Sequence, residues 1–187
     1  MRGQVVKDME KEFLDPAFRY LVNNGLENTS IRDLCKVMNV SYGSIYYWFD
    51  GKDDVYISSV KYGIGKVAKN LFGFAFENMD KPEKFFGEFL ETVDLYKAEL
   101  KLITQVAASP VYGDRIREKA DEFHKSYGKY IEDLATQLGC EAEELTPIIY
   151  MIISVLVDYV VWEDYEISRM QMKTLYDLMM MKLPKKE

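Results

Sequence analysis

Hydroxyl-bearing and aromatic side chains gather between Thr29 and Lys52, and this segment is the part of the sequence best suited to bind another molecule. It reads TSIRDLCKVMNVSYGSIYYWFDGK. Hydroxyl groups can bond to the phosphate oxygens of DNA, while small and aromatic groups can contact the methyl groups of thymine. Side chains of these types can therefore take part in the recognition of a nucleic acid.

Two short helices joined by a tight turn are expected to position these side chains. Thr29 or Ser30 can cap the first helix and Ser41 the second, because serine and threonine are preferred at the N-cap. Asn39 can supply the left-handed backbone that the turn needs. Val40 and Ile45 are expected to face inward. The outer face is then formed by Tyr42, Gly43, Ser44, Tyr46 and Tyr47. A second helix presented in this way fits the major groove.

A longer helix precedes this pair. Leu14, Ala17, Phe18 and Leu21 recur at helical spacing, and Gly25 is expected to end the helix. Pro16 lies inside the pattern, where proline removes a hydrogen bond and clashes one turn back. We therefore expect the helix to kink or restart there, with Asp15 as the N-cap and Pro16 in the first position.

The segment resembles the signature of the TetR family of bacterial transcription regulators. The matching residues are Thr29, Ser30, Ile31, Arg32, Asp33, Leu34, Val40, Ser41, Gly43, Ser44, Ile45, Tyr46, Trp48, Phe49 and Lys52. This resemblance covers about the first 55 residues and implies phosphate contacts from Thr29 or Ser30, Ser41, Tyr46, Trp48 and Lys52. It implies base contacts from Tyr42, Gly43, Ser44 and Tyr47, with Arg32 as a further candidate. For Tyr46 and Trp48 the alternative is packing within the N-terminal helical domain, which we call the head.

The sequence departs from this family pattern mainly in charge. Tyr42 replaces a basic residue, Asn39 a glycine, and Met38 and Cys35 two alanines. The chain carries a net charge of −7, and residues 1–55 hold seven Lys/Arg against nine Asp/Glu. Composition alone thus argues weakly against DNA binding. With no Lys or Arg between Lys36 and Lys52, we expect a shallow dependence of DNA affinity on salt.

The remaining chain is expected to be helical throughout. We predict an all-α fold of about nine helices, with a three-helix DNA-binding domain at 1–52 and a ligand-sensing and dimerising domain at 53–187. A fourth helix is expected from Lys52 to about Phe72. Pro82, Pro110 and Pro147 are expected to separate three longer helices, with Gly139 ending one of them. The helix between Pro82 and Pro110 is expected to transmit ligand binding. Two last helices are expected near 143–163 and 167–183.

Two sets of residues in the domain at 53–187, which we call the body, are candidates for binding. A pocket for an apolar or aromatic effector could be lined by Tyr62, Phe72, Phe89, Val93, Tyr96, Phe123, His124, Tyr127, Tyr130 and Asp158. A dimer interface could be formed by Ile148, Ile152, Val155, Tyr159, Trp162, Met172, Leu175, Leu178 and Met179. Plain core packing is the alternative for the pocket residues, because apolar stripes at helical spacing usually mean packing. For Asp158 the alternative is an ion pair or a place at the rim.

Catalysis, metal binding and cofactors are not expected. His124 is the only histidine, and Cys35 and Cys140 lack the spacing of a metal or redox motif, so we expect reduced thiols in a cytoplasmic protein. No segment of signal-peptide type opens the sequence. The apolar run from Ile148 to Trp162 is shorter than a membrane span and carries Asp158, so no membrane contact is expected.

Together these features predict a ligand-responsive regulator of transcription. A symmetric homodimer would place two recognition helices about one DNA turn apart on a near-palindromic operator. An effector would shift the population toward a state that releases DNA. Repression is the outcome that the family resemblance implies. The rival interpretation is a helical scaffold or binding protein with weak or lost operator affinity, which the acidic head permits.

Overall fold

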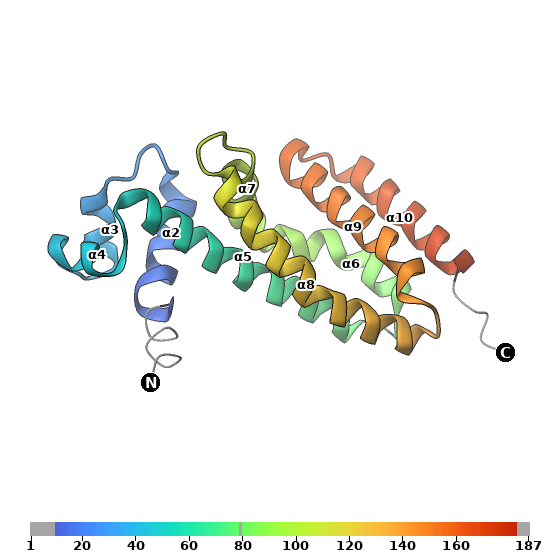
Figure 1. The fold of residues 1–187 in the computed structure, drawn as a ribbon. Coiled ribbons are helices and arrows are strands. Elements are labelled where there is room, and N and C mark those ends of the chain that lie inside the picture. Colours follow the sequence, from blue (N-terminus) through green and yellow to red (C-terminus); the bar gives the residue numbers. More distant parts are fainter. Residues whose placement is uncertain (1–9, 79, 183–187) are drawn as a thin grey trace. The chain divides into compact units, whose positions relative to one another are not determined.

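The computed structural model describes residues 10–78 and 80–182, apart from the side chains of 10–11, 118–127 and 182. Within these ranges every regular element is a helix, which confirms the predicted all-α fold (Figure 1). The elements are η1 (Glu10–Leu14), α2 (Asp15–Asn24), α3 (Ile31–Val37), α4 (Tyr42–Trp48), α5 (Lys52–Glu77), α6 (Pro82–Asp94), α7 (Lys97–Ala107), α8 (Gly113–Leu138), α9 (Ala142–Trp162) and α10 (Tyr165–Lys182).

The chain forms two compact units. Unit 1 comprises the chain up to Ala68 together with Ala98–Lys119, and unit 2 comprises Lys69–Lys97 together with the chain from Ala120 onward. Two helices, α5 and α8, begin in unit 1 and end in unit 2.

Unit 1 has one apolar core that joins the three N-terminal helices to α5, α7 and α8. Phe18 and Leu21 of α2, Leu34 of α3 and Ile45 of α4 are almost fully buried. They pack in one cluster with Val55, Tyr56 and Val60 of α5, Leu102 and Val106 of α7 and Ile116 of α8. Gly63 of α5 lies directly against the ring of Phe18, where a Cβ would clash. This close approach fixes α2 on α5.

The first helix changes type at Pro16. Residues Glu10–Leu14 form a π-helix and α2 follows directly as an α-helix with the proline in its first turn. The missing N–H of proline costs nothing there, because first-turn amides have no partner within the helix. The helix thus changes type before Pro16 but does not leave the helical region, because Leu14, the residue before α2, has φ of −73° and ψ of −35°. The expected N-cap at Asp15 is wrong. Gly25 ends α2 with φ of 75°, as predicted.

Two helix boundaries in the body differ from the sequence prediction. The helix expected between Pro82 and Pro110 is broken at Leu95 and Tyr96, whose amides bond to the carbonyls of Thr92 and Val93. The break separates α6, whose apolar face lies in unit 2, from α7, most of which lies in unit 1. Pro147 lies inside α9 and separates no helices. It falls early in that helix, where the apolar face of Leu145, Ile148 and Ile152 continues across it.

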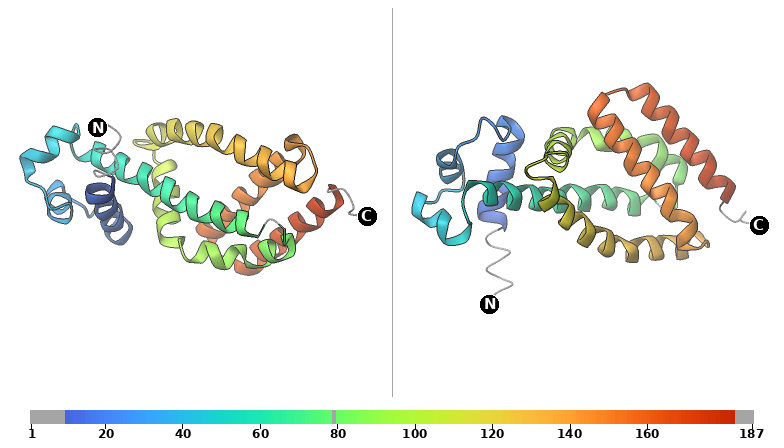
Figure 2. Two further views of the ribbon diagram at one scale, coloured as in Figure 1. Left: turned by 90° about the horizontal axis from the view of Figure 1, so that it is seen from below. Right: turned by 45° about the horizontal axis from the view of Figure 1, so that its top comes forward.

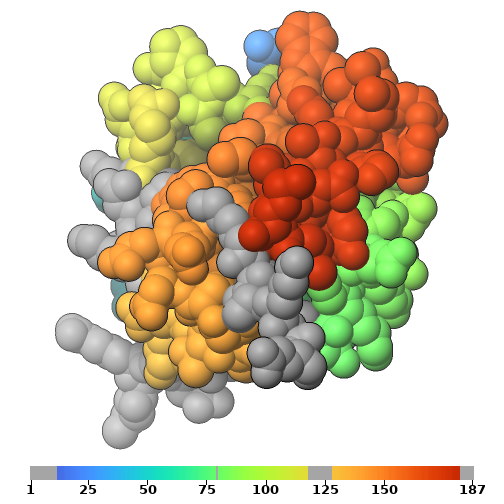
Figure 3. Space-filling view, turned by 90° about the vertical axis from the view of Figure 1, so that its right-hand side faces the viewer, coloured from blue at the N-terminus to red at the C-terminus, as the bar shows by residue number. Residues whose placement is uncertain are grey.

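Unit 2 is built around aromatic side chains and the pair α9–α10. Helix α10 packs on both α9 and α6, and Figure 3 shows it between them. The antiparallel course of α9 and α10 can be followed in Figure 2. Glu163, in the connection between them, has a left-handed backbone with φ of 57°. The core includes Phe86, Phe89 and Leu90 of α6, Ile152 and Val155 of α9, and Met172 and Leu175 of α10.

Helix α9 has the length and apolar composition of a membrane-spanning helix. Core helices of water-soluble proteins can have the same length and composition, and α9 contributes seven buried side chains to unit 2. Its apolar character is therefore weak evidence for a membrane.

Candidate nucleic-acid interface

A capping box fixes the start of α3. The amide of Asp33 donates to the hydroxyl of Ser30 over 3.2 Å, and the amide of Ser30 donates to the carboxylate of Asp33 over 2.9 Å. The Ser30 hydroxyl also donates to this carboxylate over 2.5 Å. These hydrogen bonds from Ser30 hold the pKa of Asp33 below its ordinary value. Reciprocal bonds of this kind satisfy the free amides at a helix start, so the orientation of α3 is set by its own sequence.

The turn between α3 and α4 depends on Asn39. Its φ of 54° lies in the left-handed region, as the sequence predicts. The amide of Met38 donates to the carbonyl of Leu34, and the amide of Val40 donates to the carbonyl of Cys35 over 3.0 Å. Val40 is half-buried and packs on the unit 1 core. The turn thereby holds α3 and α4 in a fixed relation.

Helix α4 presents one buried residue and a broad exposed face. Ser41 is the N-cap residue, and its hydroxyl accepts a hydrogen bond from the amide of Ser44 over 3.1 Å. The side chain of Ile45 is 1% exposed and anchors the helix to the core. Ser44 is half-buried, and its hydroxyl lies 2.7 Å from that of Ser41. The predicted caps and inward residues are therefore confirmed.

Aromatic rings cover the exposed face of α4. Tyr42 and Tyr46 are each 53% exposed, and Tyr47 is 78% exposed. The hydroxyls of Tyr42 and Tyr46 are 3.1 Å apart and their rings meet edge to face. The hydrogen bond with Tyr42 raises the pKa of Tyr46. The rings of Tyr47 and Trp48 also meet edge to face, at 4.8 Å. These contacts order the aromatic surface without burying it.

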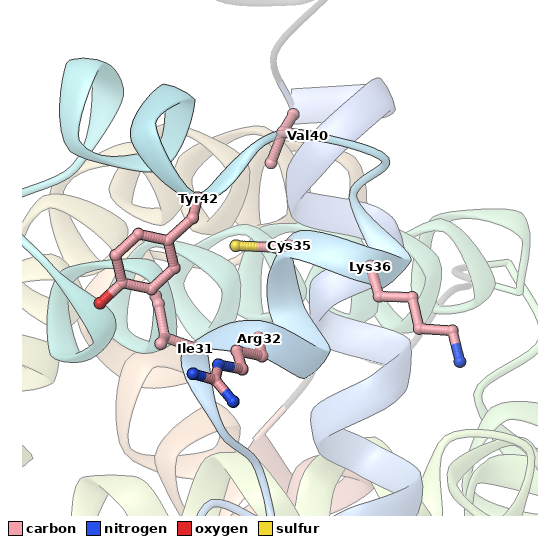
Figure 4. Close-up of a pocket in the computed structure, with 6 residues that line it drawn as sticks. All are labelled: Ile31, Arg32, Cys35, Lys36, Val40 and Tyr42. Carbon is pink, nitrogen blue, oxygen red and sulfur yellow. The ribbon is translucent and has the colours of Figure 1, made fainter.

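Positive charge comes from the residues that flank α4. Arg32 and Lys36 extend from successive turns of α3, and both side chains are exposed. They border an open hollow of about 580 Å³ with Ile31, Cys35, Val40 and Tyr42 (Figure 4). Lys52, at the start of α5, lies over the ring of Tyr56 at 4.9 Å. Lys36 was missed as a candidate contact, although its position one turn after Arg32 places both cations on one side of α3.

Thr29 does not belong to the exposed surface, which corrects its inclusion among the predicted phosphate contacts. Its side chain is 1% exposed, and its hydroxyl donates to the carbonyl of Gly25 over 2.6 Å. Its own carbonyl accepts a hydrogen bond from the hydroxyl of Tyr56. Both polar groups are thus used inside the head. Ser30, the alternative at this position, is exposed.

Polar contacts tie the start of α5 to the segment that leads into α8. The hydroxyl of Tyr112 donates to Asp53 over 3.0 Å, and Arg115 forms a 2.7 Å ion pair with Asp54. The rings of Tyr56 and Tyr112 lie edge to face at 6.4 Å. The head therefore lies in one compact unit with the start of α5 and the first turn of α8, which these polar contacts join.

The predicted pocket residues fall into several environments. Phe89 and Val93 are buried in α6, and Tyr96 is half-buried beside its end. In unit 2, Tyr130 lies within ring contact of Phe72, at 6.4 Å, and of Phe76, at 5.2 Å. Tyr62 instead belongs to unit 1, where its hydroxyl donates to Asp15. Asp158 is half-buried. The side chains of Phe123, His124 and Tyr127 lie outside the described residues.

The predicted dimer residues are mostly core residues of a single chain, which corrects the expectation that they face a partner. Trp162 is 75% exposed and Leu178 is also exposed. The other seven are buried within unit 2: Ile148, Ile152, Val155, Tyr159, Met172, Leu175 and Met179. Tyr159 donates to Asp94 over 2.8 Å and lies under Lys97. The helical period was read correctly, but the face assigned to the partner is buried within unit 2, where α10 packs on both α9 and α6.

No metal site is formed by the described side chains, since no cluster of three or more His, Cys, Asp or Glu occurs among them. The site is thus a surface of hydroxyl, aromatic and cationic groups. Two short helices with a fixed turn, the second with an exposed outer face, form a helix-turn-helix of the kind that binds DNA.

Comparison with known proteins agrees with this class. Residues 13–58 match the family of bacterial regulatory proteins, tetR family. The biofilm operon icaADBC negative transcriptional regulator IcaR of Staphylococcus epidermidis is 23% identical over 126 residues, which is 58% of this chain and 68% of that protein. IcaR of Staphylococcus aureus strain Newman is 23% identical over 137 residues, covering 67% and 70%.

Solved structures show the same fold. A transcriptional regulator of the TerR/AcrR family from Aquifex aeolicus VF5 superposes with a TM-score of 0.55 at 21% identity, covering 92% of this chain and 98% of the other. A putative fatty acid metabolism regulator from Clostridium perfringens also gives 0.55, at 16% identity and 94% and 100% coverage. The match over residues 13–58 identifies the N-terminal helices of this chain as a DNA-binding region of the tetR type.

Proposed function

We propose that the protein is a ligand-responsive repressor that binds a near-palindromic operator as a homodimer. The observation that carries this proposal is the exposed aromatic face of α4, which α3 and the Asn39 turn hold away from the core. The relatives named IcaR are negative regulators, which supports repression. Residues 1–52 would bind DNA and residues 53–187 would sense the effector and dimerise in the cytoplasm.

The proposed DNA-contacting set follows exposure. Base edges would be contacted by Tyr42, Gly43 and Tyr47, with the half-buried Ser44 at the margin. Phosphates would be contacted by the half-buried Lys52 and by six exposed residues: Ser30, Arg32, Lys36, Ser41, Tyr46 and Trp48. Contacts to phosphate set position and affinity, whereas contacts to base edges set sequence preference.

Effector binding is proposed for unit 2. The rings of Phe72, Phe76 and Tyr130 gather there, and pockets lined by aromatic residues suit apolar or aromatic ligands. Because α5 and α8 run from unit 2 into unit 1, a ligand that favours one arrangement of these helices would bias the head. Titration with naphthalene as a probe is expected to raise the thermal midpoint and to release operator DNA.

A charge placed on α4 tests DNA binding directly. Gly43 has open space where a Cβ would lie, so Gly43→Glu should fold normally while setting a carboxylate against DNA. Gly87→Glu on α6 is a matched control, since that helical glycine is equally unobstructed and the change in net charge is the same. We expect Gly43→Glu to abolish, and Gly87→Glu to preserve, binding to the DNA flanking the gene in a gel-shift assay.

Equal binding by both glutamate variants would contradict the role of α4. Failure of the unmodified chain to bind DNA selected from a random pool would instead favour the rival function, a scaffold of the same fold. That alternative is supported by the acidic head and by the absence of cationic residues from α4 itself.

A further inference from the structure

The chemistry of the α4 face narrows the class of DNA that it can read. In the major groove, guanine is usually bound by Arg or Lys, adenine by Asn or Gln, and cytosine by Asp or Glu. Helix α4 contains none of these residue types, since its sequence is YGSIYYW. Its outer face therefore lacks the side chains that make paired hydrogen bonds to those three bases.

What α4 does offer is apolar surface. The rings of Tyr42, Tyr46 and Tyr47 are more than half exposed. Gly43 lies one turn before Tyr46 and Tyr47 on the same face of the helix, with open space in place of a side chain. A small apolar group can approach the backbone there and contact the neighbouring rings.

Hydrogen bonding on this face is partly satisfied within the protein. The hydroxyls of Tyr42 and Tyr46 lie 3.1 Å apart, and the hydroxyl of Ser44 lies 2.7 Å from that of Ser41. Each such contact occupies one donor and one acceptor. Fewer donors and acceptors are therefore free to bind a base than the number of exposed hydroxyls suggests. Apolar contact thus becomes more important for discrimination between bases.

Thymine is the one base that presents an apolar group, its C5 methyl, in the major groove. We propose that α4 selects operator half-sites by contacts between its tyrosine rings, together with the open position at Gly43, and thymine methyl groups. This inference rests on the proposed DNA binding and adds the class of sequence: half-sites with thymines under α4, on either strand.

The test begins with selection of DNA from a random duplex pool by the full chain. We expect each half-site to be enriched in thymine at the positions that contact α4. Replacing those thymines by deoxyuridine removes only the methyl groups. Fluorescence anisotropy is expected to show about a fourfold weaker Kd for each methyl that the helix covers. Deoxyuridine outside the half-sites is the control and should leave Kd unchanged.

Variants of Tyr47 connect this effect to the protein. Tyr47→Ala is expected to reduce the preference for thymine over uracil at one position, whereas Tyr47→Phe keeps the ring and should keep the preference. Equal binding of thymine and uracil sites by the unmodified chain would overturn the inference while leaving DNA binding intact. Selection that enriches no sequence and detects no binding would overturn both this inference and the proposed function.

Discussion

The hydroxyl of Tyr56, in α5, donates a hydrogen bond to the main-chain carbonyl of Thr29, the residue before the N-cap of α3. The same hydroxyl lies 3.1 Å from the carbonyl of Leu26. Burial raises the pKa of Tyr56, so the hydroxyl keeps its proton at neutral pH and can donate. The side chain of Tyr56 in α5 thus fixes the loop that leads into α3 and α4.

Removing this hydroxyl should loosen the head. We expect Tyr56→Phe to lower the free energy of unfolding by about 1–2 kcal/mol, because the buried carbonyl of Thr29 loses this donor. Chemical denaturation measures the change. Tyr47→Phe removes an exposed hydroxyl and serves as the control, with an expected effect under about 0.5 kcal/mol. Equal stability of Tyr56→Phe and the unmodified chain would show that the bond contributes nothing.

The turn residue Asn39 gives a second stability prediction. Its side chain is exposed and its φ is 54°, so backbone conformation dominates the effect of a substitution. Asn39→Gly should be neutral or slightly stabilising, since glycine adopts this conformation freely. Asn39→Val should cost about 1–2 kcal/mol, because a β-branched residue is strained there. Thermal unfolding of the two variants compares them, and similar midpoints would contradict the strain argument.

These two residues illustrate how far the sequence alone reaches. Asn39 could be placed in a left-handed turn because its requirement is local and depends on residue type. The contact of Tyr56 with Thr29 joins residues 27 apart in sequence and left no local signal. The same limit explains why Thr29 was expected at the surface, since its burial depends on α5.

Helical periodicity shows a related limit in the body. The stripes on α9 and α10 identified apolar faces correctly, but a stripe does not say whether a helix of the same chain or a second chain covers it. The break at Leu95 was missed because α6 and α7 serve different units, whereas both stripes have the same period.

Asp15 predicts a dependence of stability on pH. Burial would raise the pKa of Asp15, but the hydrogen bond from Lys66, at 2.5 Å, and the charges of Lys66 and Arg19 outweigh it, so the pKa lies below its ordinary value. A depressed folded-state pKa contributes stability that is complete above the unfolded value, about 3.9, and is lost as the pH falls through the folded value.

The corresponding variant is Asp15→Asn. We expect it to be less stable than the unmodified chain by about 1 kcal/mol at pH 7, a modest value because the partners Arg19 and Lys66 are solvent-exposed. The difference should shrink as the pH is lowered below about 4, where the unmodified carboxylate also becomes protonated. Urea denaturation at pH 7 and pH 3 measures both values. A difference that stays constant over this range would rule out the charge of Asp15 as its source.

Salt dependence tests the cations beside α4. If Arg32, Lys36 and Lys52 contact phosphate in each of two heads, the slope of log affinity against log salt should be about −5. Arg32→Ala and Lys36→Ala should each bring the slope about 2 closer to zero in the dimer, while Lys173→Ala on α10, an exposed lysine paired with Asp177, should not. Titrations of operator DNA by anisotropy provide the slopes. A slope steeper than about −8 would require cations outside this surface.

The exposed apolar face of α9 predicts that the chain dimerises through this helix. Tyr150, Val157 and Val161 recur on one face of this helix and remain exposed, as does Trp162 at its end. Exposed apolar faces of this kind mark protein interfaces, and pairing with a second copy would cover them. Val157→Glu would place a charge in that interface and is expected to convert a dimer to a monomer, measured by light scattering after size exclusion.

Leu95→Glu is the matched control for this variant, because Leu95 is an exposed leucine between α6 and α7, outside the proposed interface. It should stay dimeric. The monomeric Val157→Glu variant should bind an isolated half-site as the unmodified chain does, because its head is unchanged, and should lose the added affinity for a full operator. A Val157→Glu protein that remains dimeric would move the interface away from α9, and a monomer with full operator affinity would show that pairing is not required for recognition.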